Sequence, residues 1–202
     1  MDKEAREQRL LTALTTEHFV LQTSRSATIT ESVGRATVFL SLLSASLIGL
    51  GFVSSSGHLV KPYLGAVLPT LIITGLFTFA RLVQNMVEDS LNLKRIQRIR
   101  AYYHQQFAGE YDFFTDAVTG GGDMRTIAAA VGSSPSRWKL LLTTAAMVGA
   151  VNALLIGLGA ALLIGVASGS ATWPIAVGVA VALVAFAAQL AHIGRASILL
   201  GG

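Results

Sequence analysis

Residues 140–167 read LLLTTAAMVGAVNALLIGLGAALLIGVA, a stretch that contains no Asp, Glu, Lys or Arg. A helix needs about 20 apolar residues to cross a hydrocarbon core about 30 Å thick, so this stretch is long enough to span a membrane. Three more stretches share this property: 36–53 (ATVFLSLLSASLIGLGFV), 64–80 (LGAVLPTLIITGLFTFA) and 173–194, which opens with Trp-Pro. The sequence therefore predicts an all-α, polytopic membrane protein with four transmembrane helices.

The composition agrees with a membrane protein and excludes several other classes. Of the 202 residues, 52% are hydrophobic and 13% are charged, whereas soluble domains carry about 25% charged residues. The chain has no cysteine, which excludes disulfides, thiolate zinc sites and iron–sulfur clusters. The net charge is only +4 and the basic residues flank the apolar stretches, so they indicate membrane topology and not a nucleic-acid partner.

The distribution of Lys and Arg predicts the orientation. Residues 1–35 hold five, residues 81–139 hold eight, and Arg195 follows the last stretch, whereas the short loops 54–62 and 168–172 hold only Lys61. By the positive-inside rule, both termini and the middle segment lie in the cytoplasm and the short loops outside. We expect a multi-pass protein of the cytoplasmic (inner) membrane.

These signals divide the chain into four parts. They are a cytoplasmic N-terminal helical segment (1–35), the first two spans (36–87), a cytoplasmic helical segment (88–138) and the last two spans (139–202). No Gly or Pro occurs in residues 80–108, so the second span is expected to continue into the cytoplasm as one helix. Beyond it, 110–119 and 123–131 could form short helices.

Heptad-like apolar spacing marks both cytoplasmic segments. In the middle segment, residues three and four apart form a seam made by Leu93, Ile96, Arg100, Tyr103 and Phe107. In the N-terminal segment, Leu10, Leu14 and Leu21 form an apolar stripe beside a charged face. That helix could lie on the inner leaflet or pack on the middle segment.

Polar side chains on the first two spans are candidates for lining a pore. On the second span, residues spaced three or four apart share one helical face: Thr70, Thr74, Thr78, Arg81, Asn85 and Glu88. On the first span the corresponding face includes Thr37, Ser41 and Ser44. Ser and Thr can also bond to the backbone carbonyl four residues earlier, so both a hydrated lining and simple helix packing remain open.

The third and fourth spans carry packing patterns. Small residues recur every four positions at Gly149, Ala153, Gly157, Ala161 and Gly165, a ridge that lets two helix backbones approach closely. Whether its partner helix lies in the same subunit is open at this stage. The fourth span has a seam of Gly178, Ala182, Ala185, Gln189, His192 and Ala196. Asn152 and Gln189 are expected to form interhelical hydrogen bonds.

The segment that precedes the first span resembles a known group of proteins. It contains Phe19-x-Leu21-Gln22-x-x-Arg25-Ser26, followed by Glu31 and Gly34-Arg35 at the start of a Ser-rich span. This combination resembles short actinobacterial four-span membrane proteins without an assigned function. The resemblance is carried by the first third of the chain, and implies a bacterial protein with the four-span layout and no particular activity.

No pattern in the sequence predicts an active site. The four histidines, His18, His58, His104 and His192, are scattered without metal-ligand spacing. The acidic residues Glu110, Asp112, Asp116 and Asp123 lack calcium-loop spacing, and Gly120-Gly121-Gly122 lacks the Lys of a phosphate loop. We therefore expect a protein that is not an enzyme and that binds no cofactor or metal.

Two functional hypotheses remain. The first is a homo-oligomeric channel or pore with a cytoplasmic gating segment; several copies would be needed, because one four-helix bundle has no room for a water path. The second is a non-conducting membrane adaptor, regulatory subunit or membrane effector controlled by a cytosolic protein partner. Its basis is that the outer loops are minimal, while the extramembrane residues are mostly cytoplasmic by the predicted topology.

Overall fold

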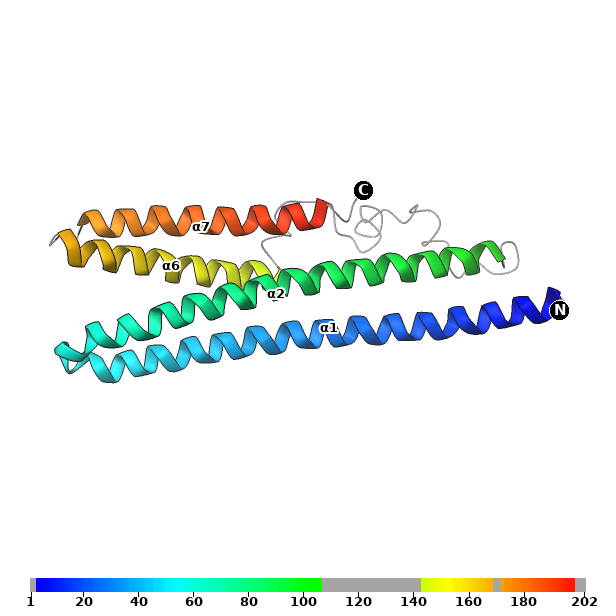
Figure 1. The fold of residues 1–202 in the computed structure, drawn as a ribbon, viewed down its shortest axis with the longest axis horizontal. Helices are drawn as coiled ribbons and strands as arrows, with labels where there is room; N and C mark the ends of the chain where they lie inside the picture. Colours follow the sequence, from blue (N-terminus) through cyan, green and yellow to red (C-terminus); the bar gives the residue numbers. More distant parts are fainter. Residues whose placement is uncertain (1–2, 107–142, 169–171, 199–202) are drawn as a thin grey trace. The chain divides into compact units, whose positions relative to one another are not determined.

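The computed structural model describes residues 3–106, 143–168 and 172–198, and nearly all of them are helical. The helices are α1 (Lys3–Ser54), α2 (Gly57–Gln106), α6 (Thr144–Ser168) and α7 (Thr172–Ile198) (Figure 1). Each of the four contains a window that is long and apolar enough to cross a membrane. The predicted all-α fold with four candidate spans is confirmed, and the chain is a multi-pass membrane protein in contact with lipid.

The first two helices are longer than the spans that they contain. Helix α1 runs without a break from the N-terminal segment into the first span, and α2 continues past the second span to Gln106, as predicted from the absence of Gly and Pro. The turn between them is short, with the amide of Ser56 bonded to the carbonyl of Val53 at 2.9 Å. The expected short helices 110–119 and 123–131 and the acidic cluster lie outside the described residues.

The predicted outer loop 54–62 is wrong at its C-terminal end. Helix α2 begins at Gly57 and includes both Pro62 and Pro69. Proline fixes φ near a helical value and removes one amide donor, so close to a helix start it costs little of the hydrogen-bond ladder. Membrane helices also tolerate an internal proline where neighbouring groups satisfy the freed carbonyl.

The chain divides into two compact units. The hairpin unit comprises Met1–Glu31, Asn85–Arg137 and Ser197–Gly202, and the bundle unit comprises Ser32–Gln84 and Trp138–Ala196. Helices α1 and α2 each contribute residues to both units, whereas α6 belongs to the bundle unit alone.

In the hairpin unit, the first part of α1 pairs in antiparallel fashion with the last part of α2. Leu21, Ile96 and Ile99 form a buried cluster, against which Leu14 and Tyr103 pack. Leu14 and Leu21 of the N-terminal stripe therefore contact the middle segment, one of the two arrangements that the sequence left open, whereas Leu10 is exposed. Of the predicted seam residues, Ile96 and Tyr103 join this cluster, Leu93 and Arg100 are half-buried, and Phe107 lies outside the described residues.

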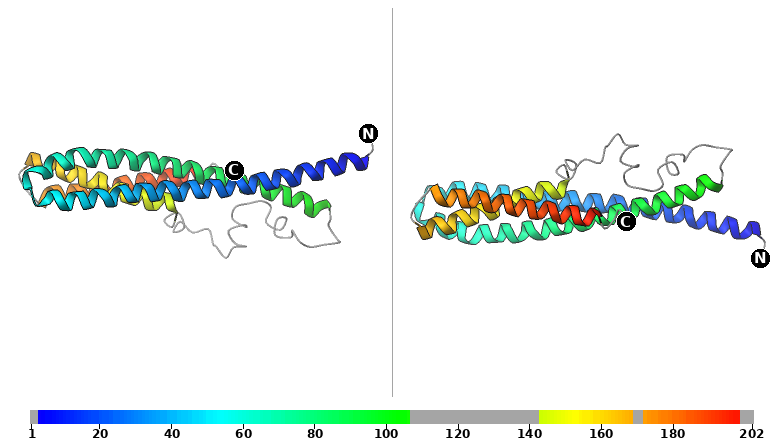
Figure 2. Two further views of the ribbon diagram at one scale, coloured as in Figure 1. Left: turned by 90° about the horizontal axis from the view of Figure 1, so that it is seen from below. Right: turned by 90° about the horizontal axis from the view of Figure 1, so that it is seen from above.

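In the bundle unit, the spans of α1, α2, α6 and α7 enclose an apolar core. Its fully buried side chains include Phe39 on α1, Val148 on α6 and Ile193 on α7, and Phe79 and Leu82 on α2 are nearly buried. Helices α6 and α7 lie side by side along their lengths (Figure 2). Large side chains fill the centre of the bundle.

Candidate pore-lining and helix-packing residues

The small-residue ridge of α6 packs against α7 of the same chain. A Cβ added to Gly157 would lie 2.5 Å from the carbonyl oxygen of Gly178 and 2.7 Å from Cβ of Ala182. A Cβ added to Gly178 would lie 2.7 Å from Cβ of Ala161. Such distances require that both glycines lack side chains, because real Cβ atoms do not approach other atoms so closely. Here the partner of the ridge is the fourth span of the same chain.

The two ends of the ridge have different neighbours. A Cβ added to Gly149 would lie 2.7 Å from Oε1 of Gln189 and 3.3 Å from the ring of Phe79. At Gly165 the nearest atom would be Cβ of Pro174, at 3.8 Å, which is an ordinary contact. Ala153, between Gly149 and Gly157, is buried. The closest approach of the α6 and α7 backbones therefore occurs at Gly157.

Two amide side chains inside the bundle do not make the hydrogen bonds expected of them. Asn152 is fully buried, and within the described residues neither Oδ1 nor Nδ2 has a hydrogen-bond partner. Its oxygen points at the space beside Gly75 of α2, next to the ring of Phe39. Oε1 of Gln189 likewise has no partner within the described part of the chain. A buried amide without partners costs free energy, because it has given up its hydrogen bonds to water.

The threonine stripe on α2 does not present one uniform face. Thr70 is exposed and its hydroxyl donates to the carbonyl of Ala66 at 2.9 Å, whereas Thr74 is half-buried and Thr78 is buried in the bundle. Arg81 is half-buried, and its guanidinium donates to Oε1 of Gln84 at 3.4 Å. The stripe thus passes from the bundle surface to its interior over about two turns.

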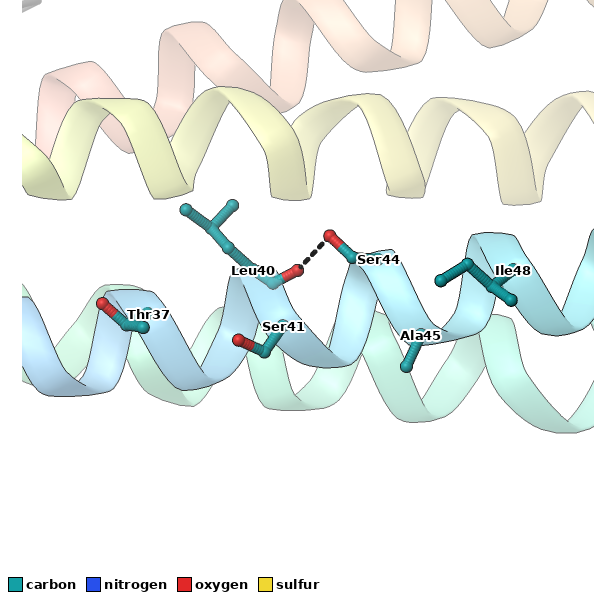
Figure 3. A pocket seen from close by; sticks show the side chains of 6 residues that line it. All are labelled: Thr37, Leu40, Ser41, Ser44, Ala45 and Ile48. Atoms are coloured by element: carbon teal, nitrogen blue, oxygen red, sulfur yellow. Dashed lines mark hydrogen bonds between the residues drawn. The ribbon is translucent and has the colours of Figure 1, made fainter.

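The hydroxyls of α1 remain on the bundle surface. Thr37, Ser41 and Ser44 are all exposed. With Leu40, Ala45 and Ile48 they line an open hollow made entirely by this helix (Figure 3). The hydroxyl of Ser44 donates to the carbonyl of Leu40 at 2.9 Å, and that of Thr37 to the carbonyl of Val33 at 2.9 Å. Each oxygen keeps lone pairs that can accept a hydrogen bond from water.

The hairpin unit contains a polar cluster that the sequence patterns did not indicate. Nε of Arg25 lies 2.7 Å from Oδ1 of Asp89, and its Nη2 lies 3.3 Å from Oδ2, so the pair is bidentate. One turn away, Nδ2 of Asn92 donates to Oγ of Ser24 at 3.1 Å. The amides of Asn92 and Asn152 therefore differ: the first is hydrogen-bonded across two helices, and the second has no partner in the described part of the chain. Opposite charges 64 positions apart gave no periodic signal that a helical wheel could reveal.

Within residues 3–106, 143–168 and 172–198, no group of three or more His, Cys, Asp or Glu side chains could hold a metal ion. His192 instead lies beside Phe79, with ring centroids 6.2 Å apart.

No family model, no curated protein and no solved structure matches this chain.

Proposed function

We propose that the protein is a homo-oligomeric channel of the bacterial inner membrane, in which the α1 hydroxyls of neighbouring copies line the conducting path. The observation that carries this proposal is the exposed position of Thr37, Ser41 and Ser44 on a helix whose spanning window is only 11% buried. Lipid offers these oxygens no hydrogen bonds, whereas water does. The bundle core is filled by side chains, so the proposed path runs between copies.

The proposal includes the orientation predicted by the positive-inside rule, with both termini in the cytoplasm. A reporter fused after Gly202 and another inserted at Gly121 would then read cytoplasmic. One inserted at Ser55 would read external. An external reading at either of the first two sites contradicts this orientation.

Flux through liposomes that contain the purified full-length protein tests conduction. The triple variant Thr37→Val, Ser41→Ala and Ser44→Ala removes the three hydroxyls with little change in volume, and an apolar constriction favours dewetting. We expect ion flux from wild type and near-background flux from the triple variant. Ser46→Ala is the matched control, because this serine lies on the same span, is half-buried and also bonds its own helix, to the carbonyl of Leu42.

A non-conducting adaptor is the second candidate. The hairpin unit favours it, because its two antiparallel helices have a core, a bidentate ion pair and cross-helix hydrogen bonds of their own. Such a hairpin is suited to receive a cytosolic protein partner. Absence of wild-type flux at all voltages and with all ions tested, in liposomes where a stable oligomer is present, would reject the channel in favour of this adaptor.

A further inference from the structure

Helix α1 carries a seven-residue repeat of hydroxyl side chains. Thr16, Thr23, Thr30, Thr37 and Ser44 are each seven positions apart. Each hydroxyl donates to the carbonyl four residues earlier, at 2.9 to 3.0 Å. The residues that own those carbonyls form a second series with the same period: Thr12, Phe19, Ser26, Val33 and Leu40. We call the two series together the α1 seam.

The spacing of the two series is that of a coiled coil. Steps of three and four alternate along the α1 seam, so its members occupy the a and d positions of successive heptads. A sustained period of seven keeps one face turned toward a partner helix that winds around it with a left-handed twist. Seven of the ten members are Ser or Thr, so the seam is not the apolar core of an ordinary coiled coil, but the period keeps all ten on one face that a parallel helix can cover.

Among the residues that the structure describes, none covers most of the seam. In the hairpin unit its members from Thr12 to Thr30 are exposed, with 74% of Phe19 accessible. In the bundle unit Val33, Thr37 and Ser44 are exposed and Leu40 is half-buried. Lipid can cover the part inside a membrane, but the part in the hairpin unit has no such cover, because the proposed topology places it in water.

The seam and the positions that flank it contain no charge. Between Thr12 and Ser44 the charged side chains are Glu17, Arg25, Glu31 and Arg35, and all four fall at b, c or f positions of the heptads. The flanking e and g positions hold uncharged residues such as Val20, Ala27, Ile29 and Gly34. In coiled coils, charged residues at e and g positions choose the partner helix by forming salt bridges with it. The α1 seam has no such charges, so nothing on it would attract a partner helix of opposite charge.

A second copy of this chain meets these conditions. Copies inserted with the same orientation are related by an axis along the membrane normal, so their α1 helices run parallel and each seam residue faces its own counterpart. A charge on the seam would then repel itself, and there is none. The hydroxyl protons of Thr12 and of the five residues in the first series are already donated within each helix, so these donors stay satisfied when the seam is covered.

We propose that the α1 seam packs in parallel against the α1 seam of a second copy, with Thr37 and Ser44 at the edge of this contact, where their hydroxyl oxygens border the proposed conducting path. This proposal rests on the homo-oligomer in the proposed function, because the seam is the interface between its copies. It does not require that the oligomer conducts ions. Gly34 at an e position has no atom within 4 Å of its would-be Cβ, so the two helices can approach closely where the two units join in sequence.

Cysteine cross-linking tests the seam directly, since the natural chain has no cysteine. Thr23→Cys, Thr30→Cys, Thr37→Cys and Ser44→Cys place single thiols on the seam. Glu17→Cys, Val38→Cys and Leu42→Cys place them at exposed positions on other faces of α1. The full-length variants are oxidised in liposomes at two lipid-to-protein ratios, and disulfide-linked dimers are measured on denaturing gels.

We expect high dimer yields at the four seam positions that do not fall on dilution with lipid, and low yields at the three controls. Equal yields on both faces, higher yields at the controls, or no cross-linking at any seam position would overturn the proposal. Flux is measured in the same liposomes before oxidation. Seam cross-links without flux reject the channel and keep the seam, whereas flux without seam cross-links rejects the seam and keeps the channel.

A charge-reversal experiment keeps the test independent of thiol reactivity. Thr30→Glu places a carboxylate opposite its own copy, and Thr30→Lys does the same with an ammonium, so each variant alone should lose the oligomer. Because opposite charges then face each other, co-expression of differently tagged Thr30→Glu and Thr30→Lys chains should restore co-purification. Oligomers that persist in both single variants, or a mixture that fails to associate, would overturn the proposal.

Discussion

The two units of this protein hold helices together by different means. In the hairpin unit the contacts are between long side chains: Arg25 with Asp89, Asn92 with Ser24, and a cluster around Ile96. In the bundle unit the closest contact is between backbones, where Gly157 meets Gly178, and the buried amide of Asn152 has no partner among the described residues. In water, the hydrophobic effect drives apolar side chains together, and ion pairs add specificity. In lipid there is no hydrophobic effect between helices, so close van der Waals packing is the main attraction.

The largest effect is expected from filling the α6–α7 contact. Gly157→Leu forces the two backbones apart along the ridge and should lower the free energy of unfolding of the bundle by about 3 kcal/mol. Thermal unfolding in detergent micelles, followed by circular dichroism, measures the change. Gly65→Leu is the control, since no atom lies within 4 Å of its would-be Cβ, and it should leave the midpoint almost unchanged. Equal losses in both variants would contradict close packing at Gly157.

A matched pair of asparagine substitutions should give effects of opposite sign. Asn152→Leu replaces an amide that has no hydrogen-bond partner among the described residues by an apolar group with the same number of heavy atoms, and should stabilise the bundle by about 1 kcal/mol. Asn92→Leu removes a hydrogen bond between α1 and α2, and should destabilise the hairpin unit by about 1 kcal/mol. Amide hydrogen exchange of the full-length protein reports the local opening of each unit. Destabilisation by Asn152→Leu would show that the amide has a partner or that the site has no room for the bulkier leucine.

Removing the ion pair in the hairpin unit should have a smaller effect that depends on salt. Asp89→Asn is expected to cost about 1 kcal/mol at low ionic strength, and less in 1 M salt, because the pair is partly exposed and therefore screened. Hydrogen exchange of residues 10–30 in the two buffers measures it. The exposed Glu17→Gln variant should behave like wild type. A loss that is the same at both salt concentrations would mean that the carboxylate acts through packing.

The smallest effect is predicted at the end of the bundle next to the turn between α1 and α2. Tyr63 donates its hydroxyl to the carbonyl of Ser46 at 2.8 Å, across α1 and α2. Interhelical hydrogen bonds in membranes contribute about 0.6 kcal/mol, so Tyr63→Phe should lower the unfolding midpoint only slightly. Tyr63→Ala additionally removes the ring beside Gly49 and should cost more. Equal effects of the two variants would mean that the hydroxyl contributes nothing.

The spans and the length of α2 could be predicted from the sequence. The spans follow from apolar runs and the length of α2 from the absence of Gly and Pro, and neither depends on which helix packs alongside. The spacing predicts Ile96 and Tyr103 as contact residues but not Ile99, because it places the seam at Arg100, whose long apolar stem and charged head fit either face. It also predicts that Pro62 lies in a loop, although proline is compatible with the start of a helix.

The sequence could not predict which side chains of a helical stripe point into the bundle and which point outward. Thr70 and Thr78 share a stripe in sequence, yet one is exposed and the other is buried, because the rotation of α2 in the bundle is set by packing against α6 and α7. The neighbours of Asn152 depend in the same way on the relative register of α1, α2 and α6. Neither rotation nor register is encoded by the spacing within a single helix.

The short turn at Ser55 and Ser56 has a consequence for the order in which the protein forms during synthesis. The contacts between α1 and α2 join residues ever further apart in the chain: 17 positions for Ser46 and Tyr63, 64 for Arg25 and Asp89, and 99 for Glu7 and Gln106. Each contact shortens the loop that the next contact must close. The loss of chain entropy on pairing α1 with α2 is therefore divided into small steps that proceed from the turn toward the two far ends. All of these residues leave the ribosome before α6 is made, so we expect the long hairpin to be complete when the last two spans enter the membrane.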